Sequence, residues 1–256
     1  MNQLRLMGKV VVISGGTKGV GKAVAESCAK EGAKVVIGGR DSVSAQLILD
    51  KMKALGLEGK FVYTDLLDIS YCRKLFNYAY ANYGRIDGFF NYAGITPVSS
   101  LDDCDENTFD KVMNINFKSC FFCCQQAVNY MRDNGGGSIV LTGSAHAWSG
   151  QKDRAAYACS KGVLLTLMEH IAHNYATENI RCNYLTMGWT PTEGELSLRK
   201  SQGESESVLR NRAAHILPMG RMCEVSDYTE ALIYLLSDAS KMMTGSIFRI
   251  TSGEYI

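Results

Sequence analysis

Tyr157 and Lys161 lie four residues apart in the segment YACSK. On a helix this spacing places both side chains on one face. A tyrosine hydroxyl titrates at about pH 10 and is a poor acid or base at neutral pH, but a neighbouring ammonium group favours the phenolate and lowers this pKa. The pair can therefore transfer protons, although the same spacing is also typical of an ordinary surface helix.

Ser144 precedes this pair and directly follows the strand-like segment SIVLTG. Because parallel strands present ligand-binding groups at their carboxyl ends, we expect the Ser144 hydroxyl to emerge at that edge of a sheet. Ser144 and His146 lack the G-x-S-x-G elbow that a hydrolase of the α/β type would need. His170 and His173 have no third ligand nearby, and we predict no metal site.

A glycine-rich turn, SGGTKGVG, occupies residues 14–21 after the first predicted strand. Gly15, Gly19 and Gly21 allow backbone amides and a helix N-terminus to approach a pyrophosphate. The spacing GxxxGxG differs from the usual GxGxxG, and a tight connection without a ligand would show the same pattern. No GK[ST] follows, which argues against a nucleoside-triphosphate loop.

The second predicted strand is followed by Arg40. At this position an acidic residue would accept a ribose hydroxyl, whereas an arginine accommodates a 2′-phosphate. Lys18 in the glycine turn could meet the same phosphate, and we therefore expect NADP(H) to be favoured over NAD(H). Asp41 keeps NAD(H) possible, because a shift of one residue would bring its carboxylate to the ribose.

Strands and helices alternate along the whole chain and can position these residues. The segment 9–14 is rich in β-branched residues without alternation, as in a strand buried on both faces, and 20–31 has helical periodicity. The order predicts an α/β fold, a doubly wound parallel sheet with helices on both faces, as one domain over 1–256. Further strands are expected over 34–38, 60–64, 86–91, 137–142, 181–185 and 246–251, and helices over 43–55, 71–83, 105–131, 155–177 and 225–236.

The charge and hydropathy of the chain argue against two kinds of partner. The 256 residues carry 27 Lys and Arg against 26 Asp and Glu, a net charge of +1, so we expect no nucleic-acid partner. No apolar run approaches the ~20 residues of a spanning helix, and the N-terminal residues lack a signal-peptide pattern. We therefore expect no membrane partner.

The cysteine count is nine, an odd number in a chain long enough to form a core without disulfides. Phe121 and Phe122 fill the spacing between Cys120 and Cys123, and no second pair completes a zinc site. We predict free thiols in a cytoplasmic protein. Six of the cysteines lie in apolar or helical stretches: Cys28, Cys120, Cys123, Cys124, Cys159 and Cys182.

Taken in order, these motifs resemble the short-chain dehydrogenase/reductase family, a Rossmann-fold family, over essentially the whole chain. Its glycine turn TGxxxGxG resembles residues 14–21, with serine in place of threonine, and its NNAG motif resembles residues 91–94, with Tyr92 in place of the second Asn. Its adenine-binding Asp matches Asp65. Its four catalytic residues match Asn116, Ser144, Tyr157 and Lys161.

The resemblance implies a nicotinamide-dependent oxidoreductase that interconverts a secondary alcohol and a ketone by hydride transfer. Tyr157 would be the general acid in reduction and the general base in oxidation. Lys161 would lower its pKa and bind the nicotinamide ribose. Ser144 would bind the substrate oxygen, and Asn116 would hold a water that relays protons from Lys161.

The resemblance also implies which residues contact the dinucleotide. The family's Pro-Gly pair reads Met187-Gly188 here, and Thr192 resembles its carboxamide contact. With Met187 and Tyr92 departing from the family pattern, a catalytically silent dinucleotide sensor or scaffold is the alternative. Expected cofactor-binding residues are Gly15, Thr17, Lys18, Gly19, Val20, Gly21, Arg40, Asp65, Leu66, Asn91, Ala93, Gly94, Tyr157, Lys161, Gly188, Thr190 and Thr192.

Residues 192–217 correspond to the family's substrate lid and are strongly charged here. They form either a solvated helical flap or a lid that recognises a polar or anionic substrate through Arg199, Arg210 or Arg212. The substrate could be a polyol or sugar, a hydroxysteroid or a 3-oxoacyl thioester. Candidate substrate-binding residues, each of which could equally serve packing, are Ser144, His146, Trp148, Tyr157 and Trp189, with Tyr184 as a further possibility.

The helix expected around residues 162–175 is apolar on more than one face. Together with the segment 121–124 it suggests an interface between copies of the chain. Dimers and tetramers are typical of the resembled family, and we expect a homodimer or homotetramer.

Overall fold

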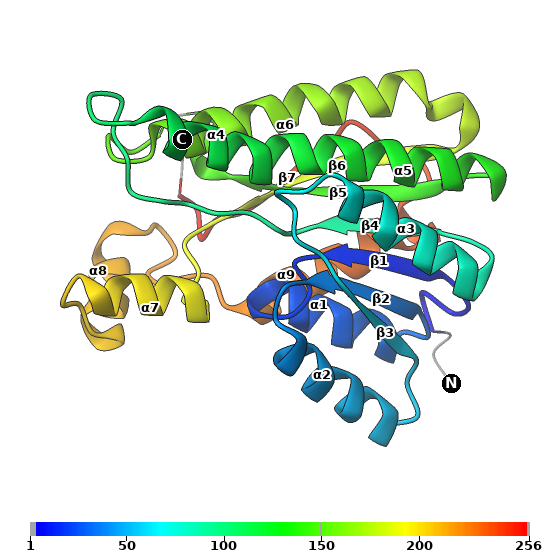
Figure 1. The fold of residues 1–256 in the computed structure, drawn as a ribbon. Coiled ribbons are helices and arrows are strands. Elements are labelled where there is room, and N and C mark those ends of the chain that lie inside the picture. The colour runs from blue at the N-terminus through cyan, green and yellow to red at the C-terminus, as the bar shows by residue number, and fades with distance from the viewer. Residues whose placement is uncertain (1–3, 149, 255–256) are drawn as a thin grey trace.

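The computed structural model describes residues 4–148 and 150–254. Its centre is a seven-stranded parallel sheet of order β3-β2-β1-β4-β5-β6-β7 (Figure 1), which confirms the expected doubly wound architecture. The strands are β1 (Val10–Ser14), β2 (Lys34–Gly39), β3 (Gly59–Tyr63), β4 (Gly88–Asn91), β5 (Gly137–Ser144), β6 (Ile180–Met187) and β7 (Ile247–Ile250).

Helices cover both faces of this sheet (Figure 1). On one face lie α3, α5 and α6, and on the other α1, α2 and α9. The helices are α1 (Gly19–Lys30), α2 (Ser42–Ala54), α3 (Ser70–Tyr83), α4 (Glu106–Met113), α5 (Ser119–Asp133), α6 (Ala155–Asn174), α7 (Glu193–Ser201), α8 (Glu206–Ile216) and α9 (Val225–Leu236).

The helices expected over 105–131 are α4 and α5, and a π-helical turn, Asn114–Lys118, lies between them. Such wider turns recur at functional sites. Within the described chain, no helix has the length and apolar character that crossing a membrane requires.

Each face of the sheet has its own apolar core. Along β1, Val12 packs with the α3, α5 and α6 side, whereas Val11 and Ile13 pack with the α1 and α9 side. Because both faces are covered, the strand is buried at every position and apolar from Val10 to Ile13, which accounts for the uninterrupted β-branched run in the sequence.

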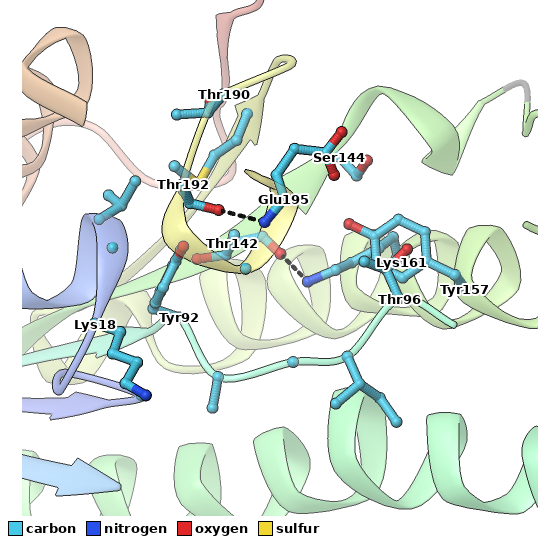
Figure 2. Close-up of a pocket in the computed structure, with 18 of the residues that line it drawn as sticks. Lys18, Tyr92, Thr96, Thr142, Ser144, Tyr157, Lys161, Thr190, Thr192 and Glu195 are labelled. Carbon is cyan, nitrogen blue, oxygen red and sulfur yellow. Dashed lines mark hydrogen bonds between the residues drawn. The ribbon is translucent and has the colours of Figure 1, made fainter. Parts of the chain in front are cut away.

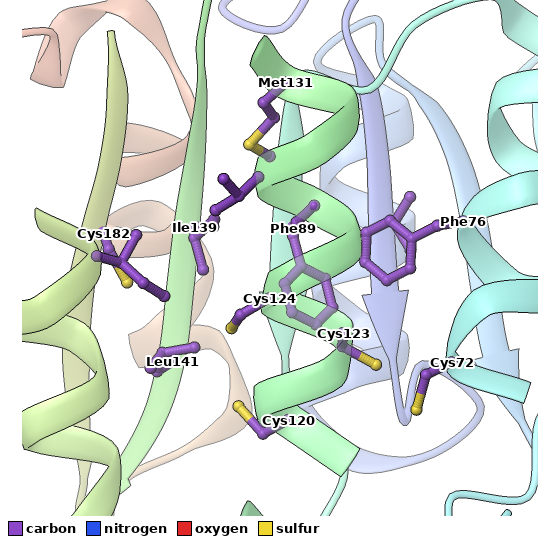
Figure 3. Packing of buried hydrophobic residues seen from close by; sticks show 14 of the residues in the cluster. Cys72, Phe76, Phe89, Cys120, Cys123, Cys124, Met131, Ile139, Leu141 and Cys182 are labelled. Atoms are coloured by element: carbon purple, nitrogen blue, oxygen red, sulfur yellow. The ribbon is translucent and has the colours of Figure 1, made fainter. Parts of the chain in front are cut away.

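Cysteines fill much of the core between α5 and the sheet (Figure 3). There they act as small apolar side chains against Phe76 and Phe89. All nine thiols are free, as predicted. Cys159 on α6 has an exposed side chain and does not pack in a core. The core cysteines on this face are Cys72, Cys120, Cys123, Cys124 and Cys182.

The carboxyl ends of the strands meet at one edge of the sheet. Ser14 at the end of β1 pairs in register with Asn91 at the end of β4, and its Oγ donates to the Asn91 Oδ1 at 2.8 Å. Ser144 at the end of β5 pairs with Met187 at the end of β6. The helices α7 and α8 extend beyond this edge (Figure 1) and line a common space together with the ends of the strands.

Gly143, next to Ser144, is required by its neighbour Tyr184. The Tyr184 ring is fully buried in β6 and occupies the space where a Cβ on residue 143 would lie, so that any side chain would overlap the ring. The position therefore accepts only glycine while Tyr184 keeps its place.

We predict that Gly143→Ala lowers the free energy of unfolding by about 1–3 kcal/mol, because overpacking displaces the Tyr184 ring or the end of β5. Gly162→Ala is the matched control: a Cβ there approaches nothing closer than the Ala147 carbonyl oxygen, at 3.7 Å, and it lies inside α6. That change should stabilise the protein by up to about 1 kcal/mol. Chemical denaturation of both variants measures the difference, and equal stabilities would contradict the steric assignment.

Candidate active site

A cavity of about 810 Å³ runs along the carboxyl edge of the sheet. The glycine turn after β1, the ends of the neighbouring strands, the first turns of α6 and the segment of α7 and α8 all line it. Among the described residues, no group of three or more His, Cys, Asp or Glu side chains could hold a metal ion. The cavity is lined by both protic and charged side chains.

Ser144, Tyr157 and Lys161 converge in this cavity (Figure 2). Ser144 ends β5, and Lys161 lies one turn after Tyr157 on α6, with its Nζ 5.7 Å from the centroid of the Tyr157 ring. Lys161 is almost fully buried, and its Nζ donates to the Thr142 carbonyl oxygen at 2.9 Å. One strand end and one helix face thus bring together the three residues that the sequence singled out.

The expected lowering of the Tyr157 pKa by Lys161 is not seen. Burial raises the pKa of Tyr157, and the nearby Ser144 hydroxyl and the Arg154 charge offset this rise only in part. The Lys161 ammonium instead donates to the Thr142 carbonyl oxygen, and burial lowers its own pKa to about 8. In this state the phenol holds its proton at neutral pH.

Tyr184 links two of the site's elements from behind the cavity. Its hydroxyl accepts from the Ser144 backbone N–H at 3.3 Å and donates to the Lys161 carbonyl oxygen at 3.1 Å. The sequence suggested Tyr184 as a pocket residue, but it is fully buried and ties the end of β5 to α6. In the sequence, the only sign of this packing role is the glycine at position 143, which leaves room for the Tyr184 ring.

Asn116 is fully buried in the π-helical turn and does not line the cavity. Its Oδ1 accepts from the Ile95 N–H at 2.8 Å, while its Nδ2 donates to the Ile95 carbonyl oxygen and to Ser160 Oγ, both at 2.9 Å. The side chain therefore fixes the loop after β4 against α6. The water-relay role implied by the resemblance stays a prediction.

Most of the expected cofactor-binding residues line the cavity. Gly21 and Asn91 do not: Gly21 packs against the Tyr92 ring, and Asn91 is buried where it holds Ser14. Tyr92, which replaces an amide in the family pattern, does line the cavity (Figure 2). The expected residues found there are Gly15, Thr17, Lys18, Gly19, Val20, Arg40, Asp65, Leu66, Ala93, Gly94, Tyr157, Lys161, Gly188, Thr190 and Thr192.

These residues fit a dinucleotide. The glycine turn passes close to the loop after β4: Gly15 has φ +77°, and a Cβ on it would lie 2.8 Å from the Ala93 backbone. Helix α1 starts after Lys18 without a side-chain cap, so its first amides can receive a phosphate. Lys161 uses one of its three N–H donors on Thr142, which leaves donors for ribose hydroxyls.

Lys18 does not stand free at the phosphate end of the cavity. Its Nζ lies 2.8 Å from Asp41 Oδ2, and Asp41 also caps α2 through the Ser44 N–H. The pairing raises the pKa of Lys18 and lowers that of Asp41. Arg40 lines the cavity and makes no ion pair with any described residue, so it carries the positive charge available there.

The lid segment is held together by paired charges around Trp189. The Trp189 Nε1 donates to Glu195 Oε1 at 2.7 Å, and the guanidinium groups of Arg199 and Arg212 lie 5.7 and 5.1 Å from its ring centroid. Arg199 pairs with Glu195 and Arg212 with Glu204. The two arginines that this segment contributes to the cavity, Arg199 and Arg212, are thus already neutralised.

Of the other three candidate substrate-binding residues, two line the cavity and one does not. Trp189 and His146 line the cavity, whereas Trp148 does not. The half-exposed Trp148 ring packs against the Arg249 guanidinium at 4.9 Å and the edge of Tyr184, away from the cavity. Arg210 is also outside it, because it pairs with Glu206 and Glu224. Sequence reasoning missed four charged residues that do line it, Arg154, Glu193, Glu195 and Glu254, and no motif marks any of them.

Comparison with known proteins covers nearly the whole chain. The family model described as "Enoyl-(Acyl carrier protein) reductase" matches residues 15–254. L-rhamnose 1-dehydrogenase (NAD(P)(+)) of Azotobacter vinelandii is 30% identical over 256 residues, 98% of each chain. A 3beta-hydroxysteroid dehydrogenase of Mediterraneibacter gnavus is 31% identical over 267 residues, covering 96% of this chain and 94% of that protein.

Among solved structures, levodione reductase superposes with a TM-score of 0.91 at 27% identity, over 97% of this chain and 98% of that one. The matches extend from the glycine turn through the lid to the last strand, the same span that builds the cavity. The chain belongs to the short-chain dehydrogenase/reductase family and is an NAD(P)-dependent oxidoreductase acting between secondary alcohols and ketones.

Proposed function

We propose that this protein interconverts a secondary alcohol and a ketone with NADP(H), using Tyr157 as the proton donor and acceptor. The observation that carries the proposal is the convergence of Ser144, Tyr157 and Lys161 in the cavity that also receives the uncapped start of α1. A bound nicotinamide would supply the hydride chemistry. The chain supplies proton transfer, orientation and exclusion of water.

Each side chain has a role that its position allows. The Tyr157 hydroxyl gives its proton to the carbonyl oxygen in reduction and takes it back in oxidation. The Ser144 hydroxyl holds the same oxygen, where negative charge develops. Lys161 would use its remaining N–H donors on the ribose hydroxyls of a bound dinucleotide. Asn116 fixes the loop that forms the wall opposite them.

Loss of the phenol hydroxyl tests this assignment. We predict that Tyr157→Phe lowers kcat by about 10²–10⁴-fold, because the variant lacks the hydroxyl that exchanges a proton with the reacting oxygen. The dinucleotide should still bind, as followed by the fluorescence of the reduced nicotinamide. Tyr130→Phe removes a hydroxyl from the surface of α5, where it bonds to Asn77, and should leave kcat unchanged.

Near-normal turnover by Tyr157→Phe would refute the proton-transfer role. Tight dinucleotide binding by the unaltered protein with no turnover of any alcohol or ketone would instead favour the silent sensor.

We further propose that NADP(H) is preferred over NAD(H). Arg40 follows the end of β2 and makes no ion pair with the described residues, so its guanidinium can bind a 2′-phosphate through two donors. Lys18 can contribute only after it separates from Asp41, which holds it at 2.8 Å. The preference therefore depends chiefly on Arg40.

Arg40→Ala should reduce kcat/KM for NADPH by about 10-fold or more, the effect of one lost charge-assisted contact. The value for NADH should not change, because NADH has no 2′-phosphate. Lys53→Ala, at the far end of α2, removes an exposed cation outside the cavity and serves as the control. Steady-state kinetics with both cofactors measure the ratio, and equal losses with NADPH and NADH would disprove the assignment.

The segment 192–217 is proposed as the substrate lid, because α7 and α8 contribute Glu195, Arg199 and Arg212 to the cavity wall. The relatives act on a sugar and on a steroid according to their names. A polyol or sugar, a hydroxysteroid and a 3-oxoacyl thioester are the substrate classes proposed. The nine free thiols fit a reducing, cytoplasmic compartment, which is likewise a proposal.

We propose that copies of the chain associate through the face formed by α4 and α5. The expected apolar excess of α6 is mostly used within the chain, since Leu164, Leu167 and Met168 are buried in the core. Phe109 on α4 and Phe121 on α5 are 44% and 42% exposed, unusual for rings of this size. They mark the face that a second copy would cover.

Sedimentation should give two or four times the mass of the chain, and Phe121→Glu should reduce that mass, because a charge replaces a buried ring at the interface. The control is Val43→Glu, which changes an exposed side chain on α2. Phe61→Glu would not serve, because that ring packs on the core. The variant Val43→Glu should keep the parent mass. A monomer at every concentration of the unaltered protein would exclude the association.

A further inference from the structure

We propose that the substrate is polyhydroxylated, a polyol or sugar, and that Glu195 and Arg154 bind hydroxyl groups next to the reacting carbon. The proposal rests on the proposed function, because it names the substrate class of the same site. It selects one of the three classes left by the sequence.

One of the two carboxylate oxygens of Glu195 has no hydrogen-bond donor among the described residues. Glu195 lies in the first turn of α7 and lines the same cavity as Ser144 (Figure 2). Trp189 and Arg199 donate to its Oε1, at 2.7 and 2.8 Å. Its Oε2 accepts no hydrogen bond from residues 4–148 or 150–254. Because Oε1 is fixed from two directions, Oε2 is available to a ligand in the cavity that Glu195 lines.

Arg154 has donors in reserve on the other side of the site. It precedes the first turn of α6, is only 5% exposed, and lines the same cavity. Its Nη1 donates to the carbonyl oxygen and to Oδ2 of Asp153, at 3.0 and 2.9 Å. Its Nε and Nη2 donate to none of the described residues. A guanidinium this buried gains from an acceptor that a ligand brings.

Both charges act on the reacting phenol. The Glu195 charge raises the pKa of Tyr157 and the Arg154 charge lowers it. Arg154 also helps burial to lower the pKa of His146, whose ring centroid lies 5.8 Å from that of Tyr157. Both side chains line the same cavity as Ser144, Tyr157 and Lys161.

Hydroxyl groups match this pair, because each can donate to a carboxylate and accept from a guanidinium. The methylene surface of a steroid or an acyl chain would displace water from Glu195 and Arg154 without replacing its hydrogen bonds, which costs free energy. An anionic substrate finds no unpaired lid cation, since Glu195 and Glu204 neutralise Arg199 and Arg212. A neutral compound with several hydroxyls is the class that fits.

The test compares substrate classes and one isosteric variant. The unaltered protein is assayed for kcat/KM with pentitols, hexitols and aldoses, with cyclohexanol, with a hydroxysteroid and with a 3-hydroxyacyl thioester. The polyhydroxylated compounds should give the highest values. Glu195→Gln keeps an oxygen for Trp189 and Arg199 but removes the free carboxylate oxygen.

In Glu195→Gln, kcat/KM for the polyhydroxylated substrates should fall by about 10- to 100-fold, mainly through KM, as expected for one charge-assisted hydrogen bond. The value for cyclohexanol, which has no second hydroxyl, should fall much less, because loss of the Glu195 charge reaches it only through the pKa of Tyr157. Arg154→Lys keeps a charge but loses the forked donors and should show the same selective loss. Glu206→Gln, which lies on α8 outside the cavity, should change neither.

A steroid or thioester as best substrate, or an equal loss for cyclohexanol in Glu195→Gln, would overturn this proposal and leave the proposed oxidoreductase chemistry intact. Absence of turnover with every compound and both cofactors would refute the proposed function, and the substrate assignment with it.

Discussion

The buried ammonium group of Lys161 is the constraint on which the site depends. Removing this group from water is costly, and its pKa falls to about 8 as a result. Within the described chain it bonds only to the Thr142 carbonyl oxygen. Other contacts therefore fix the position of the helix that carries it. Tyr184 fixes the Lys161 carbonyl, and Asn116 bonds to Ser160 one residue before it.

These supports come from separate parts of the chain, which explains why the site requires the complete fold. Tyr184 belongs to β6, Asn116 to the π-helical turn and Thr142 to β5. The parallel sheet delivers β5 and β6 to the same edge in register, with Ser144 opposite Met187. Close packing at this edge leaves no room for a side chain at Gly143 or Gly15, since each touches a neighbouring segment. Precision of the catalytic groups is therefore a property of the sheet edge, not of α6 alone.

The sequence predicted what depends on local pattern and missed what depends on side-chain partners. Strands buried on both faces show as uninterrupted apolar runs, and the helical face shared by Tyr157 and Lys161 follows from their spacing. The pairing of Lys18 with Asp41 was not predicted, because the two residues come from different turns that meet only in the fold. The outward position of Trp148 depends in the same way on Arg249, a residue of the last strand.

The direction of the Tyr157 pKa shift is another property that the sequence alone did not predict. Spacing alone places an ammonium near the phenol, but the extent of burial decides which effect is larger, and burial is a property of the whole edge. Here desolvation prevails, and the site holds a neutral phenol beside an amine of lowered pKa. Such a pair is set to donate a proton rather than to receive one. Oxidation in the reverse direction uses the phenolate, which a positive charge in the cavity would favour; a bound oxidised nicotinamide would supply such a charge.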